Sequence, residues 1–178
     1  MTTSILEWGP VSLIRRNHGL EHATLNLLTK RQPGSFAGHS DARGFWIIGN
    51  VSTDLLLEIA QEALERMKKG ERELAIHPYC GTNFVTTGLV AGSLAWLFTL
   101  GKANSLKKKL DRWPLLVLAI TAGAVLAHPL GFKAQEQVST SGTPGSLQIK
   151  QIVRYERKGP VMHRIITGES NQKGSENS

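Results

Sequence analysis

The sequence predicts an α+β protein that also carries a hairpin of two apolar helices. A helical pattern follows Pro10, with leucines recurring every seven residues from Leu13. Short strand-like runs flank a helical segment between residues 45 and 77. Two long uncharged apolar runs follow at 84–100 and 114–127. The 178 residues suffice for one domain with a core, or for a small domain with a membrane element.

Composition narrows the classes of partner. The net charge of +7 suits an anionic membrane surface or nucleic acid. Only 6% of residues are aromatic and no Lys/Arg tract is interleaved with them, so we expect no nucleic-acid partner. Cys80 is the only cysteine, so an intramolecular disulfide is impossible. Residues 1–10 lack a basic stretch before an apolar run, so we expect no cleavable signal peptide.

The sequence pattern of the first part of the chain predicts a helix followed by a β–α–β unit. Pro10 suits the first turn of a helix that runs to about Arg31. Residues 45–51 are typical of a strand, and residues 52–54 offer hydroxyl and carboxylate caps for a helix that ends near Lys69. Residues 73–77 predict a second strand.

A similar unit is predicted after the apolar runs. Gly-Phe followed by Val-Ser-Thr occurs at 131–140 with the spacing that it has at 44–53. A helix-like piece at 147–156 and an apolar run at 161–166 come next. The sequence therefore predicts two β–α–β half-units, as in a split β–α–β sandwich. The first, at 45–77, belongs to a domain 1–83 that also holds the N-terminal helix and the metal motifs, and the second spans 131–167. The tail from residue 168 to 178 is polar and is predicted to be disordered.

The segment 84–130 is predicted to be a transmembrane helical hairpin with a basic loop at 101–112. Each run is near the roughly 20 residues that a helix needs to cross a bilayer. Small residues four apart, Gly88 with Gly92 and Ala119 with Gly123, suggest a close approach of the two helices. The alternative is a buried pair of core helices in a soluble protein, which we consider weaker because the two runs are a large apolar fraction of a small chain.

The predicted partner is thus the lipid bilayer, and the predicted location is a bacterial inner or thylakoid-type membrane. Loops rich in Lys and Arg are usually cytoplasmic, which favours a cytosolic position for the basic loop at 101–112. Basic residues at 66–72 and the absence of a signal peptide favour a cytosolic N-terminal domain instead. We favour the cytosolic side for that domain.

The predicted helix at 10–31 carries His18-Gly19-Leu20-Glu21-His22, an H-x-x-E-H motif. His18 and His22 lie one turn apart on one face, with Glu21 at its edge and the leucines on roughly the opposite face. Two imidazoles at this spacing can bind one metal ion, and the carboxylate can bind it too or accept a proton from its water. The order of residues is that of the inverzincin metallopeptidases.

A second group of ligand-type residues is His77-Pro78-Tyr79-Cys80-Gly81-Thr82-Asn83. His77 and Cys80 are three apart in a Pro/Gly turn, so both side chains can point at one centre. Thiolate and imidazole favour Zn²⁺, which is the predicted cofactor. We predict His18, His22, His77 and Cys80 as metal ligands and Glu21 as the catalytic base. His39 and Asp41, in a Gly-rich loop, are further candidates for the site.

The two motifs together resemble the paired signature H-G-x-E-H … H-x-x-C-G-T of the YqhQ-like family of bacterial membrane proteins. A related cyanobacterial family of unknown function is similar as well. The resemblance covers most of residues 15–145. It implies a metal site at His18, Glu21, His22, His77 and Cys80, and it implies no particular reaction.

Two functions follow as hypotheses. The first is a membrane-embedded, zinc-dependent hydrolase of unknown substrate, with one metal position open to water and Glu21 as the base. The second is a membrane-anchored interaction protein whose zinc site is closed by four protein ligands and is purely structural. The coordination shell distinguishes the two.

Overall fold

A computed structural model of the protein describes residues 5–100, 106–156 and 159–170. Within these ranges the chain forms four α-helices and one four-stranded antiparallel sheet, which confirms the α+β class. It divides into two compact units, Met1–His77 with Glu136–Ser178, and Pro78–Gln135. The four-part domain division stays a prediction.

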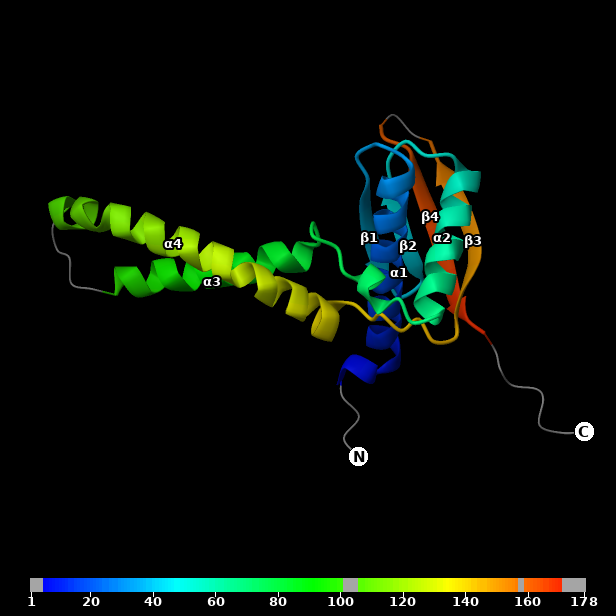
Figure 1. Ribbon diagram of the computed structural model, residues 1–178, viewed down its shortest axis with the longest axis horizontal. Helices are drawn as coiled ribbons and strands as arrows, with labels where there is room; N and C mark the ends of the chain where they lie inside the picture. The colour runs from blue at the N-terminus through cyan, green and yellow to red at the C-terminus, as the bar shows by residue number, and fades with distance from the viewer. Residues whose placement is uncertain (1–4, 101–105, 157–158, 171–178) are drawn as a thin grey trace, which may run out of the picture. The chain divides into compact units, whose positions relative to one another are not determined.

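The sheet of the first unit has the order β1-β2-β4-β3 (Figure 1). Its strands are β1 (Ala37–Asp41), β2 (Gly44–Ile48), β3 (Leu147–Tyr155) and β4 (Met162–Glu169). Neighbouring strands are antiparallel, and Phe45 of β2 pairs with Ser40 of β1 on one side and Ile165 of β4 on the other. The last two strands thus lie beside β2 of the first hairpin, although about a hundred residues separate the two hairpins along the chain.

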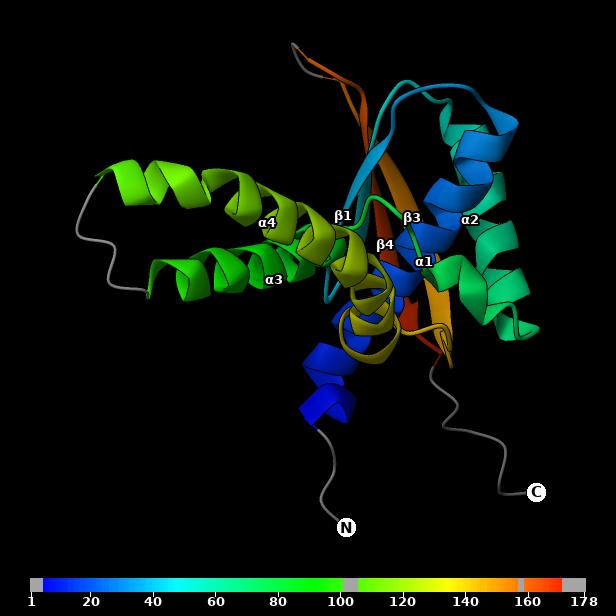
Figure 2. The same ribbon diagram turned by 60° about the vertical axis from the view of Figure 1, so that its left-hand side comes forward.

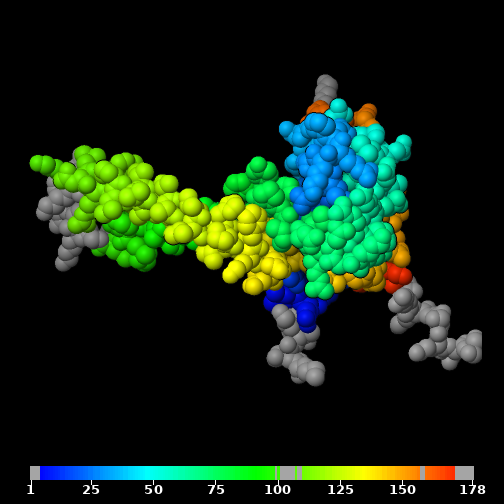
Figure 3. Space-filling model, in the orientation of Figure 1, coloured from blue at the N-terminus to red at the C-terminus, as the bar shows by residue number. Residues whose placement is uncertain are grey.

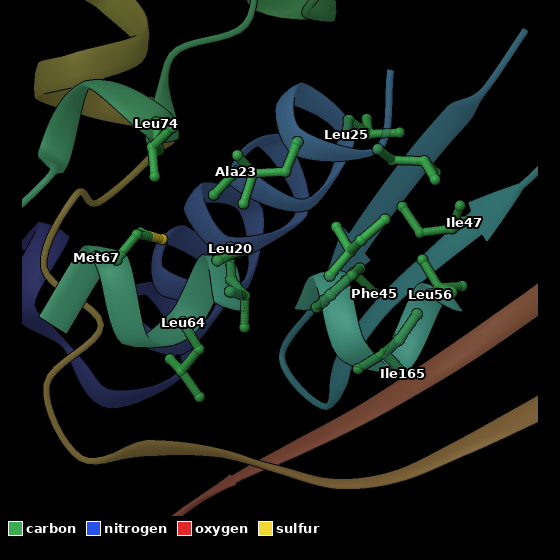
Figure 4. Packing of buried hydrophobic residues seen from close by; sticks show 14 of the residues in the cluster. Leu20, Ala23, Leu25, Phe45, Ile47, Leu56, Leu64, Met67, Leu74 and Ile165 are labelled. Atoms are coloured by element: carbon green, nitrogen blue, oxygen red, sulfur yellow. The ribbon is translucent and has the colours of Figure 1, made fainter. Parts of the chain in front are cut away.

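Helices α1 (Gly9–Arg31) and α2 (Thr53–Lys68) cover one face of this sheet (Figures 1 and 2). Both were predicted, and the Ser52 side chain accepts a hydrogen bond from the Leu55 amide as the α2 cap. The core lies between the helices and the sheet (Figure 4). Its fully buried large side chains include Leu20, Leu28, Phe45, Ile47, Leu56, Ile59, Leu147 and Ile165.

A predicted strand is helical in the structure, and a predicted helix is a strand. Residues predicted as a strand at 73–77 contain a short 3₁₀ helix, η2 (Arg72–Ala75), and the helix-like piece at 147–156 is strand β3. A register shift between Ile149 and Gln151 interrupts the alternation of β3. The apolar spacing of the strand therefore imitates a helical period, which is why the prediction was wrong.

The predicted β–α–β half-units are also wrong. The Gly-rich segment predicted as a loop forms β1, which pairs with β2 in a hairpin before α2 begins. Gly and Ser have low strand propensity, so pairing with the apolar β2 decides this segment. In the order β1-β2-β4-β3, each half contributes two strands that pair directly and have no helix between them, so the two halves are β-hairpins and not β–α–β units.

The second unit consists of α3 (Gly81–Thr99) and α4 (Leu106–Ala134), which pack against each other (Figures 1 and 3). A Cβ atom at Gly123 would lie 2.2 Å from Leu94 Cδ1, so Gly123 does permit the close approach of α4 to α3. Gly88 and Gly92 do not, because nothing lies within 4 Å of where their Cβ atoms would be.

One helix among the described residues, Leu110–Ser139, is long and apolar enough to cross a membrane by length and composition alone. It includes the π-helical turn η3 (Gln135–Ser139) that follows α4. Of the predicted basic loop, residues 101–105 lie outside the described residues, and Leu106 onward belongs to α4. Of the predicted tail, Gly168 and Glu169 are part of β4 instead, and residues 171–178 lie outside the described part.

Candidate metal centre

The two histidines of the H-x-x-E-H motif lie together on α1. Their ring centroids are 4.3 Å apart in an edge-on arrangement, with His22 buried and His18 half-buried. One helical turn separates them, so their side chains leave the same face in parallel. The helix alone accounts for this proximity, and the sequence predicted it.

The Nδ1 atom of each ring lies against a backbone carbonyl oxygen. His18 Nδ1 is 2.9 Å from the oxygen of Ser139, and His22 Nδ1 is 2.8 Å from the oxygen of Ala75. A carbonyl oxygen only accepts, so each Nδ1 carries the proton and donates it. The lone pair then resides on Nε2 of both rings, which is the arrangement that holds metal-binding histidines in one tautomer and orientation.

His77 lies beside this pair at the end of the first unit. Its ring centroid is 5.5 Å from that of His22. Burial, together with the nearby His22, lowers the pKa of His77 below its ordinary value. The neutral form of the ring, which is the form that binds metals, is therefore favoured at neutral pH.

Cys80 follows His77 by three residues and is the residue from which α3 begins. Three residues of extended chain span about 11 Å at most, so Cys80 stays in the neighbourhood of His77. Together, His18, His22 and Cys80 offer one nitrogen or sulfur ligand atom each and could bind a metal ion. His77 as a further ligand stays a prediction.

Glu21 lies on the β1 side of α1. Its carboxylate accepts a hydrogen bond from Ser40 Oγ, and a Cβ atom at Gly38 would lie 2.1 Å from its Oε1 atom. Burial raises the pKa of Glu21, although the bond from Ser40 and the nearby His18 and His39 act in the opposite direction. The role of Glu21 as a base stays a prediction.

No sequence pattern identifies Ser40 and Gly38 as neighbours of Glu21. The Gly-rich composition of this segment predicts a loop, in which no alternation of side chains is expected. In β1 they are two residues apart, so both face α1, and the contact becomes apparent only once this strand is recognised.

Asp41, the last residue of β1, accepts hydrogen bonds within the sheet unit. Its Oδ1 accepts bonds from the Arg43 amide and from Arg164 Nη2, both at 2.7 Å. Burial favours the neutral acid, but the bonds from Arg164 and Arg43 outweigh it and lower the pKa of Asp41. His39 pairs with Trp46 across the hairpin and is exposed.

Comparison with known proteins places the chain in a family. A family model described as a domain of unknown function, DUF6391, matches residues 13–152. An uncharacterized protein of Picosynechococcus sp. (strain ATCC 27264 / PCC 7002 / PR-6) is 34% identical, over 78% of this chain and 71% of that protein. No solved structure matches the chain significantly. The expected kinship with a cyanobacterial protein of unknown function is confirmed, and the resemblance to the YqhQ-like family stays a prediction. The chain belongs to the DUF6391 family.

Proposed function

We propose that this chain is an integral membrane protein that binds one zinc ion through His18, His22 and Cys80. The observation that carries the proposal is the pair of Nδ1–H bonds to the carbonyls of Ser139 and Ala75. They fix the orientation of two adjacent imidazoles and keep the proton of each ring on Nδ1, which is how metal-binding histidines are held. Imidazole with thiolate is a donor set that zinc prefers.

His77 determines which kind of site this is. With His77 as a fourth protein ligand the site is closed and structural, and the 5.5 Å contact between the His22 and His77 rings favours this alternative. With His77 beside the metal but not bound to it, one position stays open for a substrate or water.

In the open case we propose a hydrolase. Zinc would supply a Lewis acid for a carbonyl or phosphoryl oxygen. Glu21 would act as the general base: it lies beside His18 in sequence and space, and burial raises the pKa of its carboxyl group toward the range in which acid–base groups work at neutral pH. Ser40 would hold the orientation of that carboxylate.

The proposed membrane insertion of α3 and α4 is supported by the apolar side chains that both helices expose. On α3 these include Leu89, Trp96 and Leu97, and on α4 they include Leu118, Val125 and Leu126. Exposed apolar surface of this extent is unusual in a soluble monomer and ordinary in lipid.

The first test is metal content. We expect the purified full-length protein to contain about one zinc per chain, and the double variant His18→Ala/His22→Ala to contain almost none. His128→Ala, which changes a histidine outside the proposed ligand set, is the matched control and should retain the metal. Equal metal content in wild type and the double variant would refute the proposed site.

The second test is the coordination shell. X-ray absorption at the zinc edge distinguishes one sulfur and two nitrogen ligands with an oxygen from one sulfur and three nitrogen ligands. The first result supports the hydrolase and justifies a screen of ester and phosphoester substrates against wild type and Glu21→Gln. The second result, with His77→Ala losing one nitrogen ligand, establishes the structural alternative.

A further inference from the structure

Four consecutive backbone carbonyls at the end of η3, those of residues 137–140, are all bound by side chains of α1. Arg15 Nε donates to the oxygen of Val138 at 2.8 Å, and its Nη2 donates to those of Gln137 and Thr140 at 3.0 and 3.1 Å. His18 Nδ1 takes the remaining one, Ser139. The last carbonyls of a helix have no hydrogen-bond donor within the helix. Here Arg15 and His18, one turn apart on α1, provide the donors.

The backbone strengthens the same contact. The Ser141 amide donates to the carbonyl oxygen of Arg15 at 2.9 Å. A Cβ atom at Gly19 would lie 2.2 Å from the Ser141 oxygen, so only glycine permits this approach. The remaining guanidinium nitrogen of Arg15, Nη1, donates a fourth hydrogen bond to the oxygen of Leu6 at 3.4 Å. One guanidinium thus bridges the segment 137–140 and the start of the chain.

We propose that Arg15 is a positioning residue for the metal ligand His18. It acts through the Ser139 carbonyl: by binding the carbonyls on both sides, Arg15 holds the oxygen that fixes the tautomer and the ring orientation of His18. A planar fork with five N–H donors can bind several carbonyls at once, whereas a lysine ammonium is a single point of charge. The metal-binding part of this inference rests on the proposed function.

The test uses full-length protein in detergent micelles and the variants Arg15→Gln and Arg15→Lys. Arg16→Gln is the matched control, because it removes the same charge one residue along α1, where Arg16 pairs with Glu169 at 2.9 Å. Two quantities are measured: the imidazole Nδ1–H signals of His18 and His22 by NMR on metal-free protein, and the zinc Kd by chelator competition.

We expect Arg15→Gln to lose the slowly exchanging His18 Nδ1–H signal and to keep that of His22, whose acceptor is Ala75. The zinc Kd should rise about 10- to 100-fold, the usual loss when a residue that orients a metal ligand is removed. Arg15→Lys should restore part of the affinity, and Arg16→Gln should change neither quantity.

The outcomes separate the two proposals. If the wild type binds no zinc, the proposed function fails, while selective loss of the His18 signal in Arg15→Gln still supports positioning. If the wild type binds zinc and Arg15→Gln keeps both the His18 signal and the affinity, the inference is overturned and the function stands. If Arg15→Gln loses both histidine signals, Arg15→Lys decides: retention of the His22 signal, with the His18 signal weakened or restored, supports positioning, and loss of both signals overturns it.

Discussion

At the scale of single residues, the structure explains side chains that sequence patterns leave ambiguous. Glu21 could have been a metal ligand, a base or a solvated acid. Its carboxylate is buried against β1, where Ser40 donates to it and the missing side chain of Gly38 makes room. A buried carboxyl group needs such a partner, because desolvation without one is costly. Neither partner is near Glu21 in the sequence.

Gly38→Ala should therefore destabilise the protein by about 1–3 kcal/mol, because the new methyl group overlaps the Glu21 carboxylate and forces it away from Ser40. Urea unfolding measures the difference. Gly168→Ala is the control in another strand, where the methyl group would meet only the flexible Lys150 side chain at 3.2 Å. Equal effects of the two substitutions would show that the Glu21 contact does not restrict position 38.

His163 is a second residue whose environment only the fold reveals. It is fully buried in β4, its Nε2 lies 3.2 Å from Thr53 Oγ1, and among the described residues its Nδ1 has no hydrogen-bond partner. Burial, with a contribution from the charge of Arg154, lowers its pKa in the folded protein.

We accordingly expect His163 to make folding pH-dependent. Below about pH 6.5, the ordinary value, the unfolded chain binds a proton at this residue and the folded chain does not. The unfolding free energy should thus fall as the pH drops from 7.5 through 6.5 toward the lowered folded pKa. His163→Gln should have a shallower dependence over that window in urea unfolding. Parallel curves for the two proteins would contradict the assignment.

At the scale of elements, α1 organises the first unit. Its leucines face the sheet and α2, its histidines donate hydrogen bonds to the carbonyls of Ser139 and Ala75, and Gly19 lies against the segment after η3. The seven-residue spacing predicted the apolar side correctly. What lies against the polar side comes from segments fifty to a hundred and twenty residues away, which no local pattern specifies.

Gly19→Ala tests that contact. Glycine to alanine inside a helix ordinarily stabilises it by roughly 0.5–1 kcal/mol, but here the methyl group would displace Ser141. We expect faster hydrogen exchange of the Ser141 amide, which donates to Arg15, and a net loss of stability. Gly92→Ala, at a helical glycine with open space around it, is the matched control and should be neutral or stabilising. Unchanged exchange at Ser141 in Gly19→Ala would argue against the close contact.

At the scale of the whole molecule, the chain combines a small α+β unit with a helical pair of different character. The first unit has a closed core between two helices and a sheet. The second exposes apolar side chains along both helices. Water favours the first arrangement and lipid the second.

A charge on the exposed apolar surface of α4 should therefore impair the membrane insertion that we propose. Leu118→Arg introduces an arginine where a leucine is 66% exposed. A charge in the hydrocarbon region costs up to about 2.5–3.5 kcal/mol at its centre. We expect a smaller fraction of the variant in carbonate-washed membranes. Ile5→Arg is the control, because it places the same charge at an exposed aliphatic residue of the first unit. Complete extraction of the wild type by carbonate would contradict insertion itself.

The sequence alone determined the features that depend on neighbours along one helix or on composition. These are α1, α2 and the apolar helices, the pairing of His18 with His22, and the α+β class. Helical periodicity is local, so a single segment reveals it. Only the tertiary structure decided that residues 37–41 and 147–155 are strands, that Ser40 faces Glu21, and that Ser139 and Ala75 orient the histidines. Strand pairing, a β-bulge and hydrogen bonds to backbone carbonyls depend on partners distant in the chain, and those partners are set by the packing of the whole unit.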